Sequence, residues 1–75
     1  MIYVRKAEQD YPFSEGILAK SLTGAGLSVT EAYDIVKEIR QELREEEVGR
    51  ITSDEIKTIV SEKLIERGRT REERF

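Results

Sequence analysis

The sequence predicts an α+β domain that is predominantly helical. Three capping sequences each precede apolar residues at helical spacing, whereas the N-terminal segment has the composition of a β-strand. A chain of 75 residues can build one hydrophobic core. We therefore expect a single domain over residues 1–75, with a β-hairpin over 1–13 and a bundle of three or four helices over 14–75.

The hairpin is predicted from two short apolar segments. Residues 2–6 begin with a β-branched and aromatic mixture that suits a half-buried strand. Residues 11–13 can return as the second strand, and Pro12 restricts that strand to an edge or an end. The polar residues 7–10 between them contain no glycine, so we expect a loose hairpin.

The first helix is expected to run from Ser14 to about Thr23. Ser14 can cap the helix, while Phe13 and Leu18 are spaced to form a hydrophobic staple across its first turn. The glycines in residues 24–26 can adopt a positive φ angle and close the last turn.

The second helix carries the clearest periodic pattern in the chain. Ser28 and Glu31 have the spacing of a capping box. One apolar stripe follows at helical spacing and consists of Ala32, Ile35, Val36, Ile39 and Leu43. Three glutamates at 45–47 are unfavourable near the negative end of a helix dipole, so we expect the helix to fray before Gly49.

A connector and a third helix complete the predicted elements. We expect a connector over residues 48–51, with a short third strand near Ile51 as the alternative. Thr52 and Glu55 repeat the capping-box spacing, and the helix that they begin should stop at Gly68. The charged segment from Thr70 onward could start a fourth helix.

Composition and charge exclude several classes of function. The chain has no cysteine and no histidine, which excludes disulfides and the usual zinc sites, and we predict no metal held by protein ligands. A net charge of −3 argues against binding nucleic acid. No apolar run approaches the roughly 20 residues that span a membrane, so we expect a cytoplasmic protein. The abundance of Glu, Arg and Lys without Asn is typical of proteins from thermophiles.

The order of these elements resembles the ATP-cone family across nearly the whole chain. Residues 12–23 and 25–27 are similar to the cone-like segment at the N-terminus of archaeal 2-phosphoglycerate kinases. The resemblance implies a hairpin lid, here residues 1–13, over a helical bundle that binds ATP or a related adenine nucleotide.

The resemblance also implies which residues meet the phosphates. Arg5 and Lys6 match a Lys-Arg pair of the family in reversed order, and both side chains can bind phosphate. The alternative is that these two charges only keep an exposed edge strand from pairing with neighbouring molecules. Glu8 stands where the family has glycine. Ile17 stands where the family has a lysine, and Lys20 lies one turn further along the helix, where it can compensate.

Further contacts are implied at the third helix and on the apolar side of the site. The polar contacts of the family at the start of that helix fall on Ser53 and Lys57, four residues apart. The adenine is expected to rest against four apolar or aromatic residues, namely Tyr3, Val4, Phe13 and Ile17.

These observations predict a regulatory or accessory nucleotide-binding domain of a 2-phosphoglycerate kinase-like protein. The chain is not expected to be an enzyme on its own, because it lacks a G-x-x-x-x-G-K-[ST] phosphate loop and any nucleophile beside a base. Its expected partners are an adenine nucleotide and, in a full-length protein, a C-terminal kinase domain. The alternative is a degenerate cone without a ligand, which would act as an interaction module or homodimer through apolar surface at its C-terminal end.

Overall fold

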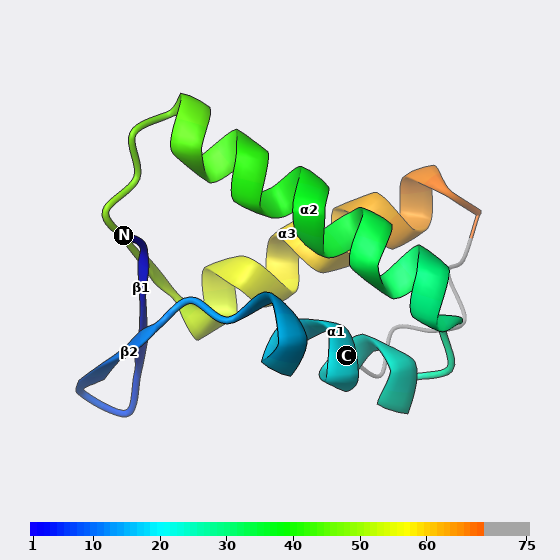
Figure 1. Ribbon diagram of the computed structural model, residues 1–75, viewed down its shortest axis with the longest axis horizontal. Helices are drawn as coiled ribbons and strands as arrows, with labels where there is room; N and C mark the ends of the chain where they lie inside the picture. The colour runs from blue at the N-terminus through cyan, green and yellow to red at the C-terminus, as the bar shows by residue number, and fades with distance from the viewer. Residues whose placement is uncertain (69–75) are drawn as a thin grey trace.

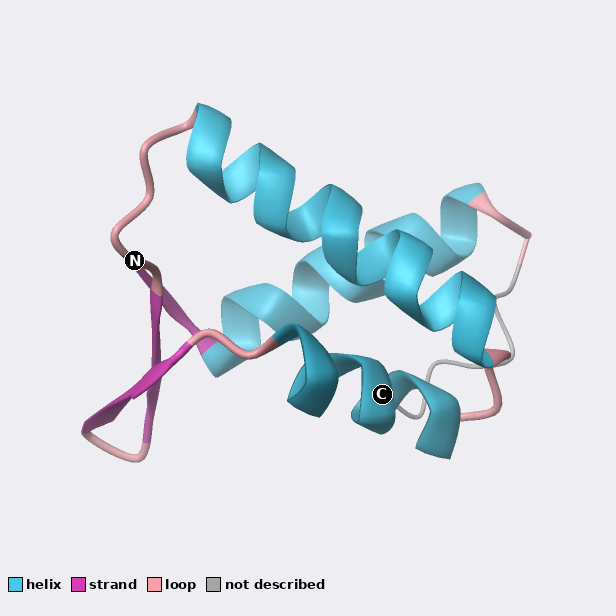
Figure 2. Cartoon of the chain, viewed as in Figure 1, coloured by secondary structure: helices cyan, strands magenta, loops and turns pink. Residues whose placement is uncertain are grey.

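Residues 1–68 fold into three helices and a three-stranded sheet (Figure 1). The structure is a computed structural model that describes residues 1–68. Within this range the predicted α+β class is confirmed, and helix predominates. The predicted fourth helix from Thr70 lies outside the described residues. The hairpin projects from the helices at one end of the molecule (Figure 2).

The N-terminal hairpin is tight, contrary to the expected loose one. Its strands are β1, Tyr3–Lys6, and β2, Gln9–Pro12, which pair antiparallel so that Lys6 lies opposite Gln9. Ala7 and Glu8 alone form the turn, with φ angles of 52° and 66°. Positive φ at both central residues is the geometry of a type I′ turn, which follows the twist of the two strands. The turn therefore forms without the glycine that usually marks it.

A third strand forms around Ile51, as the alternative interpretation of residues 48–51 predicted. This strand, β3, spans Arg50–Thr52 and pairs parallel with β1, which lies in the middle of the order β2-β1-β3. Ile51 is buried and lies opposite Val4 in the parallel register. The sheet therefore joins the N-terminal hairpin directly to the start of the last helix.

The first helix, α1, spans Glu15–Gly24 and has the predicted caps. The Ser14 hydroxyl accepts a hydrogen bond from the Ile17 amide at 3.2 Å. At the other end Gly26 has a φ angle of 110°, and the Leu27 amide donates to the Leu22 carbonyl at 3.2 Å. This Schellman geometry turns the chain back and buries Leu27.

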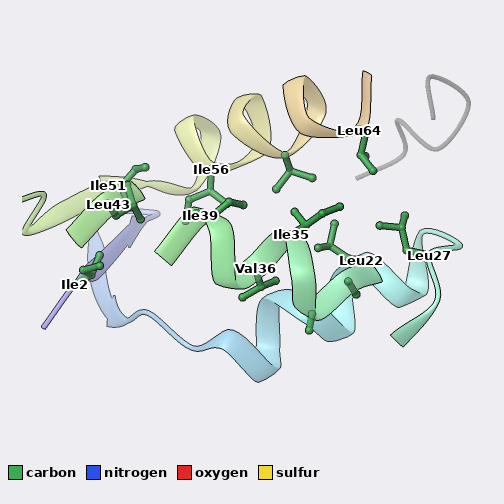
Figure 3. Packing of buried hydrophobic residues seen from close by; sticks show 13 residues of the cluster. Ile2, Leu22, Leu27, Ile35, Val36, Ile39, Leu43, Ile51, Ile56 and Leu64 are labelled. Carbon is green, nitrogen blue, oxygen red and sulfur yellow. The ribbon is translucent and has the colours of Figure 1, made fainter. Parts of the chain in front are cut away.

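The second helix, α2, spans Val29–Glu45 and passes between the other two helices (Figure 3). The Ser28 hydroxyl accepts from the Glu31 amide at 3.2 Å, as expected for the N-cap. All five residues of the predicted apolar stripe are buried. The helix ends before Gly49 as predicted, but Glu47 takes the left-handed turn with a φ angle of 55°.

The third helix, α3, spans Ser53–Glu66 and begins with the predicted capping box. The Thr52 hydroxyl accepts from the Glu55 amide at 3.1 Å, and the Glu55 carboxylate accepts from the Thr52 amide at 3.1 Å. Two hydrogen bonds from Thr52 hold the pKa of Glu55 below its ordinary value. The bond from the backbone amide has the larger effect and the bond from the hydroxyl the smaller one. Gly68 follows the helix with a φ angle of 75°.

The core lies where α2 meets α1 on one side and α3 on the other. Figure 3 shows Ile35 and Ile39 of α2 close to α3, where Leu64 and Ile56 also point inward. The hairpin adds Ile2 and the sheet adds Ile51 to the same cluster. Burial of this apolar surface stabilises the helices against one another and fixes the base of the hairpin.

Candidate functional site

A groove of about 450 Å³ lies where the hairpin meets the first turns of α1 and α3. Two parts of the chain line it, residues 4–21 and the first turns of α3, and most of their lining side chains are apolar. The hairpin contributes Val4, Lys6, Ala7, Tyr11 and Pro12. The helices and the junction before α1 contribute Phe13, Ser14, Ile17, Leu18, Ser21, Ser53, Ile56 and Lys57.

The structure brings together most of the residues predicted for the site. The six predicted residues that line the groove are Val4, Lys6, Phe13, Ile17, Ser53 and Lys57. They come from β1, from the junction before α1, from α1 and from α3. The remaining three predicted residues, Tyr3, Arg5 and Lys20, are not among its lining residues.

The position of Arg5 follows from the geometry of a strand. Successive side chains of a strand point to opposite faces of the sheet, so Arg5 faces away from Val4 and Lys6. Its guanidinium lies 3.3 Å from an Asp10 carboxylate oxygen, and the other oxygen lies 3.5 Å from the guanidinium of Arg50. Asp10 thus bridges β2 to both other strands. Arg5 has a structural partner on the far side of the sheet.

Seven of the thirteen lining residues were not predicted for the site, and three of them show why. Tyr11 lies opposite Val4 in the hairpin register, so it reaches the groove only because the turn is two residues long. Ile56 belongs to the core, where it is only 6% exposed, and it also lines the groove. Ser21 lies one turn after Ile17, and this helical spacing was the available signal.

The electrostatic character of the groove is positive. Lys6 and Lys57 are its only charged lining residues within the part of the chain that the structure describes, and they approach it from different elements. Three hydroxyl groups, from Ser14, Ser21 and Ser53, add polar contacts. The same described residues contain no group of three or more acidic side chains that could hold a metal ion. An apolar wall with two cations and a few hydroxyls suits an anion attached to a flat apolar group.

A larger hollow of about 740 Å³ lies beside α2. Its lining is polar throughout and consists of Glu15, Lys37, Arg40, Gln41, Arg44 and Glu45. Arg40 already forms an ion pair with Glu15. Because the lining of this hollow is much less apolar than that of the groove under the hairpin, the groove is the better candidate site for a ligand with an apolar part.

The fold is that of a small domain of three helices in which the β-hairpin, α1 and α3 line one groove. A sequence comparison identifies the family of this domain. The sequence model of the ATP cone domain matches residues 2–73. This match covers nearly the whole chain. The chain therefore belongs to the ATP cone domain family.

Several curated relatives are 2-phosphoglycerate kinases. The protein of Methanococcus maripaludis is 42% identical over 66 residues, which is 88% of this chain and 21% of the relative. That of Methanopyrus kandleri is 39% identical over 74 residues, covering 99% of this chain and 23% of the relative. That of Pyrococcus horikoshii is 44% identical over 57 residues, or 76% and 19%. The chain thus spans about a fifth of the length of these relatives.

The comparisons agree with the predicted character of the source. The relatives come from archaea and include proteins of thermophiles, as the resemblance and the composition had predicted.

No solved structure matches the chain. Among residues 1–68, no helix has both the length and the apolar character that crossing a membrane requires.

Proposed function

We propose that the groove binds an adenine nucleotide. The apolar wall formed by Val4, Phe13 and Ile17 would receive the base, while Lys6 and Lys57 would meet the phosphates. The observation that carries this proposal is that six predicted residues line one groove, four of them within residues 4–17 and two at the start of α3. Tyr3, Arg5 and Lys20 were also proposed as contacts, but the two lysines of the groove provide the charge without them.

The proposed role is that of a regulatory or accessory domain in a 2-phosphoglycerate kinase-like protein. The relatives support it, because this chain corresponds to about a fifth of each kinase. The geometry supports it as well. Lys6 lies on the hairpin and Lys57 on α3, so a phosphate chain held by both would draw the hairpin towards the helices. The hairpin would then act as the lid expected for the family.

Isothermal titration with ATP, ADP and dATP tests the proposal. We expect saturable binding, and we expect Lys57→Met to weaken it about tenfold, because one charge-assisted contact contributes roughly 1.5 kcal/mol or more. Lys37→Met is the matched control, since it removes the same charge from an exposed position on α2 that does not line the groove. The absence of binding heat at millimolar nucleotide would contradict the proposal.

The alternative function is a cone that keeps the scaffold and works as an interaction or dimerisation module. Two exposed apolar residues favour it, since Ile17 is 72% exposed at the groove and Ile65 is 52% exposed near the end of α3. Light scattering separates the two functions. A dimer that forms equally with and without nucleotide supports the interaction module, whereas assembly that depends on nucleotide supports regulation.

A further inference from the structure

We propose that the groove takes its nucleotide free of Mg²⁺, so that Mg²⁺ weakens the binding of ATP. This inference rests on the proposed function and adds the charge state of the ligand. It would make the domain respond to uncomplexed ATP, and hence to the balance between ATP and magnesium.

The charges that line the groove favour the more negative form of the nucleotide. Lys6 and Lys57 contribute two positive charges, and no carboxylate is among the lining residues in the described part of the chain. A positive site binds the more negative ligand more tightly, because the attraction grows with the product of the charges. ATP carries a charge of about −4 near neutral pH, and a bound Mg²⁺ reduces it to about −2, which roughly halves the attraction to the two ammonium groups.

The groove also lacks the carboxylate ligands that would hold the metal, within the described residues. Mg²⁺ is usually bound to proteins through one or two carboxylates together with the phosphates of the nucleotide. The acidic residues that flank the groove are engaged elsewhere. Glu55 accepts hydrogen bonds from Thr52, Glu15 forms an ion pair with Arg40, and Asp10 bridges two arginines on the far face of the sheet.

Two further carboxylates, those of Glu8 and Asp54, directly follow groove residues in the sequence but are not themselves lining residues. Glu8 lies in the hairpin turn and Asp54 in the first turn of α3, and both are exposed without lining the groove. The serine hydroxyls of the lining are neutral. A magnesium ion on the phosphates would therefore compete with Lys6 and Lys57 for the same oxygens and gain no acidic ligand from the groove.

Titration of ATP in two buffers of equal ionic strength tests the inference. One buffer contains EDTA and the other contains Mg²⁺ in excess over ATP. We expect the affinity for ATP to be at least about tenfold lower with Mg²⁺, since even 1.4 kcal/mol of lost attraction is a factor of ten. AMP is the ligand control. It lacks the adjacent phosphates that chelate Mg²⁺, so its affinity should be nearly the same in both buffers.

A variant gives the test a second readout. Ser53→Asp places a carboxylate at the first position of α3, where the helix dipole favours negative charge and the side chain lines the groove. We expect this variant to bind ATP more weakly in EDTA and to lose most of the difference between the two buffers. A variant that retains the full difference would contradict the argument from missing metal ligands.

The outcomes separate this inference from the proposed function. If ATP binds equally well or more tightly with Mg²⁺, the inference is wrong and nucleotide binding stands. If no nucleotide binds in either buffer, the proposed function is wrong and the inference falls with it.

Discussion

Two glutamates, Glu8 and Glu47, hold left-handed backbone conformations, with φ angles of 66° and 55°. Such a conformation costs an ordinary L-residue roughly 1–2 kcal/mol, whereas glycine adopts it readily. Glu47 follows α2 and allows the Val48 amide to donate to the Leu43 carbonyl at 2.9 Å. This is the hydrogen bond that Gly26 makes possible after α1. The ends of α1 and α2 therefore share one geometry, with glycine at the left-handed position after α1 and glutamate at that position after α2.

Replacing Glu47 with glycine should stabilise the protein. We expect Glu47→Gly to raise the free energy of unfolding by about 1 kcal/mol, because it relieves the left-handed strain and removes a negative charge at the end of α2. Glu46→Gly is the matched control. Glu46 has a φ angle of −87°, so the same change of residue type should cost about 0.5–1 kcal/mol. Urea unfolding measures both, and equal effects of the two substitutions would contradict the account.

The hairpin turn offers a parallel test. Glu8→Gly should raise the free energy of unfolding by about 1 kcal/mol, because glycine is favoured at the second position of a type I′ turn. Glu8→Gln separates conformation from charge, since it removes the charge and keeps the strain. We expect it to have little effect on thermal unfolding. A gain from the glutamine variant as large as that from glycine would assign the effect to charge instead.

Residue-level signals predicted the beginnings of all three helices. Ser14, Ser28 and Thr52 cap them as expected. Each cap is a hydroxyl that accepts a hydrogen bond from the amide three residues later, so it depends only on neighbouring sequence and could be predicted. The tight turn at Ala7 and Glu8 was not predictable in this way. Neither residue type favours positive φ, and the conformation results from strand pairing on either side of the turn.

At the scale of single elements, the alternation of side chains along β1 decides which of them can reach the groove. Lys6 and Val4 share one face with the groove, while Arg5 shares the other with Asp10. The family resemblance treated Arg5 and Lys6 as an adjacent pair, yet neighbours in a strand point in opposite directions. The period of two was available in the sequence and would have placed these two residues on different faces.

The contact between α2 and α3 contains an ion cluster at its edge. The Lys63 ammonium lies 2.5 Å from the Glu42 carboxylate and 3.5 Å from that of Glu38. Arg67, one turn further along, also pairs with Glu38. The sequence did not predict this cluster, because periodicity shows where the core lies and not which charges a neighbouring helix brings. Lys63 itself is only 9% exposed.

This cluster predicts how stability depends on pH above neutrality. Burial disfavours the charge of Lys63, but Glu42 and Glu38 outweigh it, so the pKa of Lys63 lies above its ordinary value. A group whose pKa is raised by folding stabilises the protein below its unfolded pKa and loses that contribution as pH rises through the folded pKa. We therefore expect the free energy of unfolding to fall at pH values above about 10.4.

Comparison with Lys63→Met isolates this contribution from the other groups that titrate in the same range. The variant removes the charge and keeps a chain of similar length in the buried position. Its stability should fall less steeply than that of the parent protein over the same alkaline range. Parallel curves of unfolding free energy against pH would contradict the proposed role of the cluster.

At the scale of the whole molecule, the groove depends on a contact that local sequence did not determine. The parallel pairing of β1 with β3 joins residues that are nearly fifty positions apart, and β3 has only three residues. Ile51 suited either a connector or a strand, because so short a segment has no readable period. Because this pairing was not predicted from local sequence, only the family resemblance indicated that Ser53 and Lys57 lie beside the hairpin.

The proposed function requires one ligand to be held between the hairpin and the first turns of α1 and α3. Backbone amide chemical shifts, followed by NMR during titration with ATP, test this most directly because they report where the ligand lies. The account predicts saturable shifts concentrated at residues 4–8, 11–18 and 53–57. Shifts concentrated around Lys37, Arg40 and Arg44 of α2, or no saturable shifts at all, would contradict it.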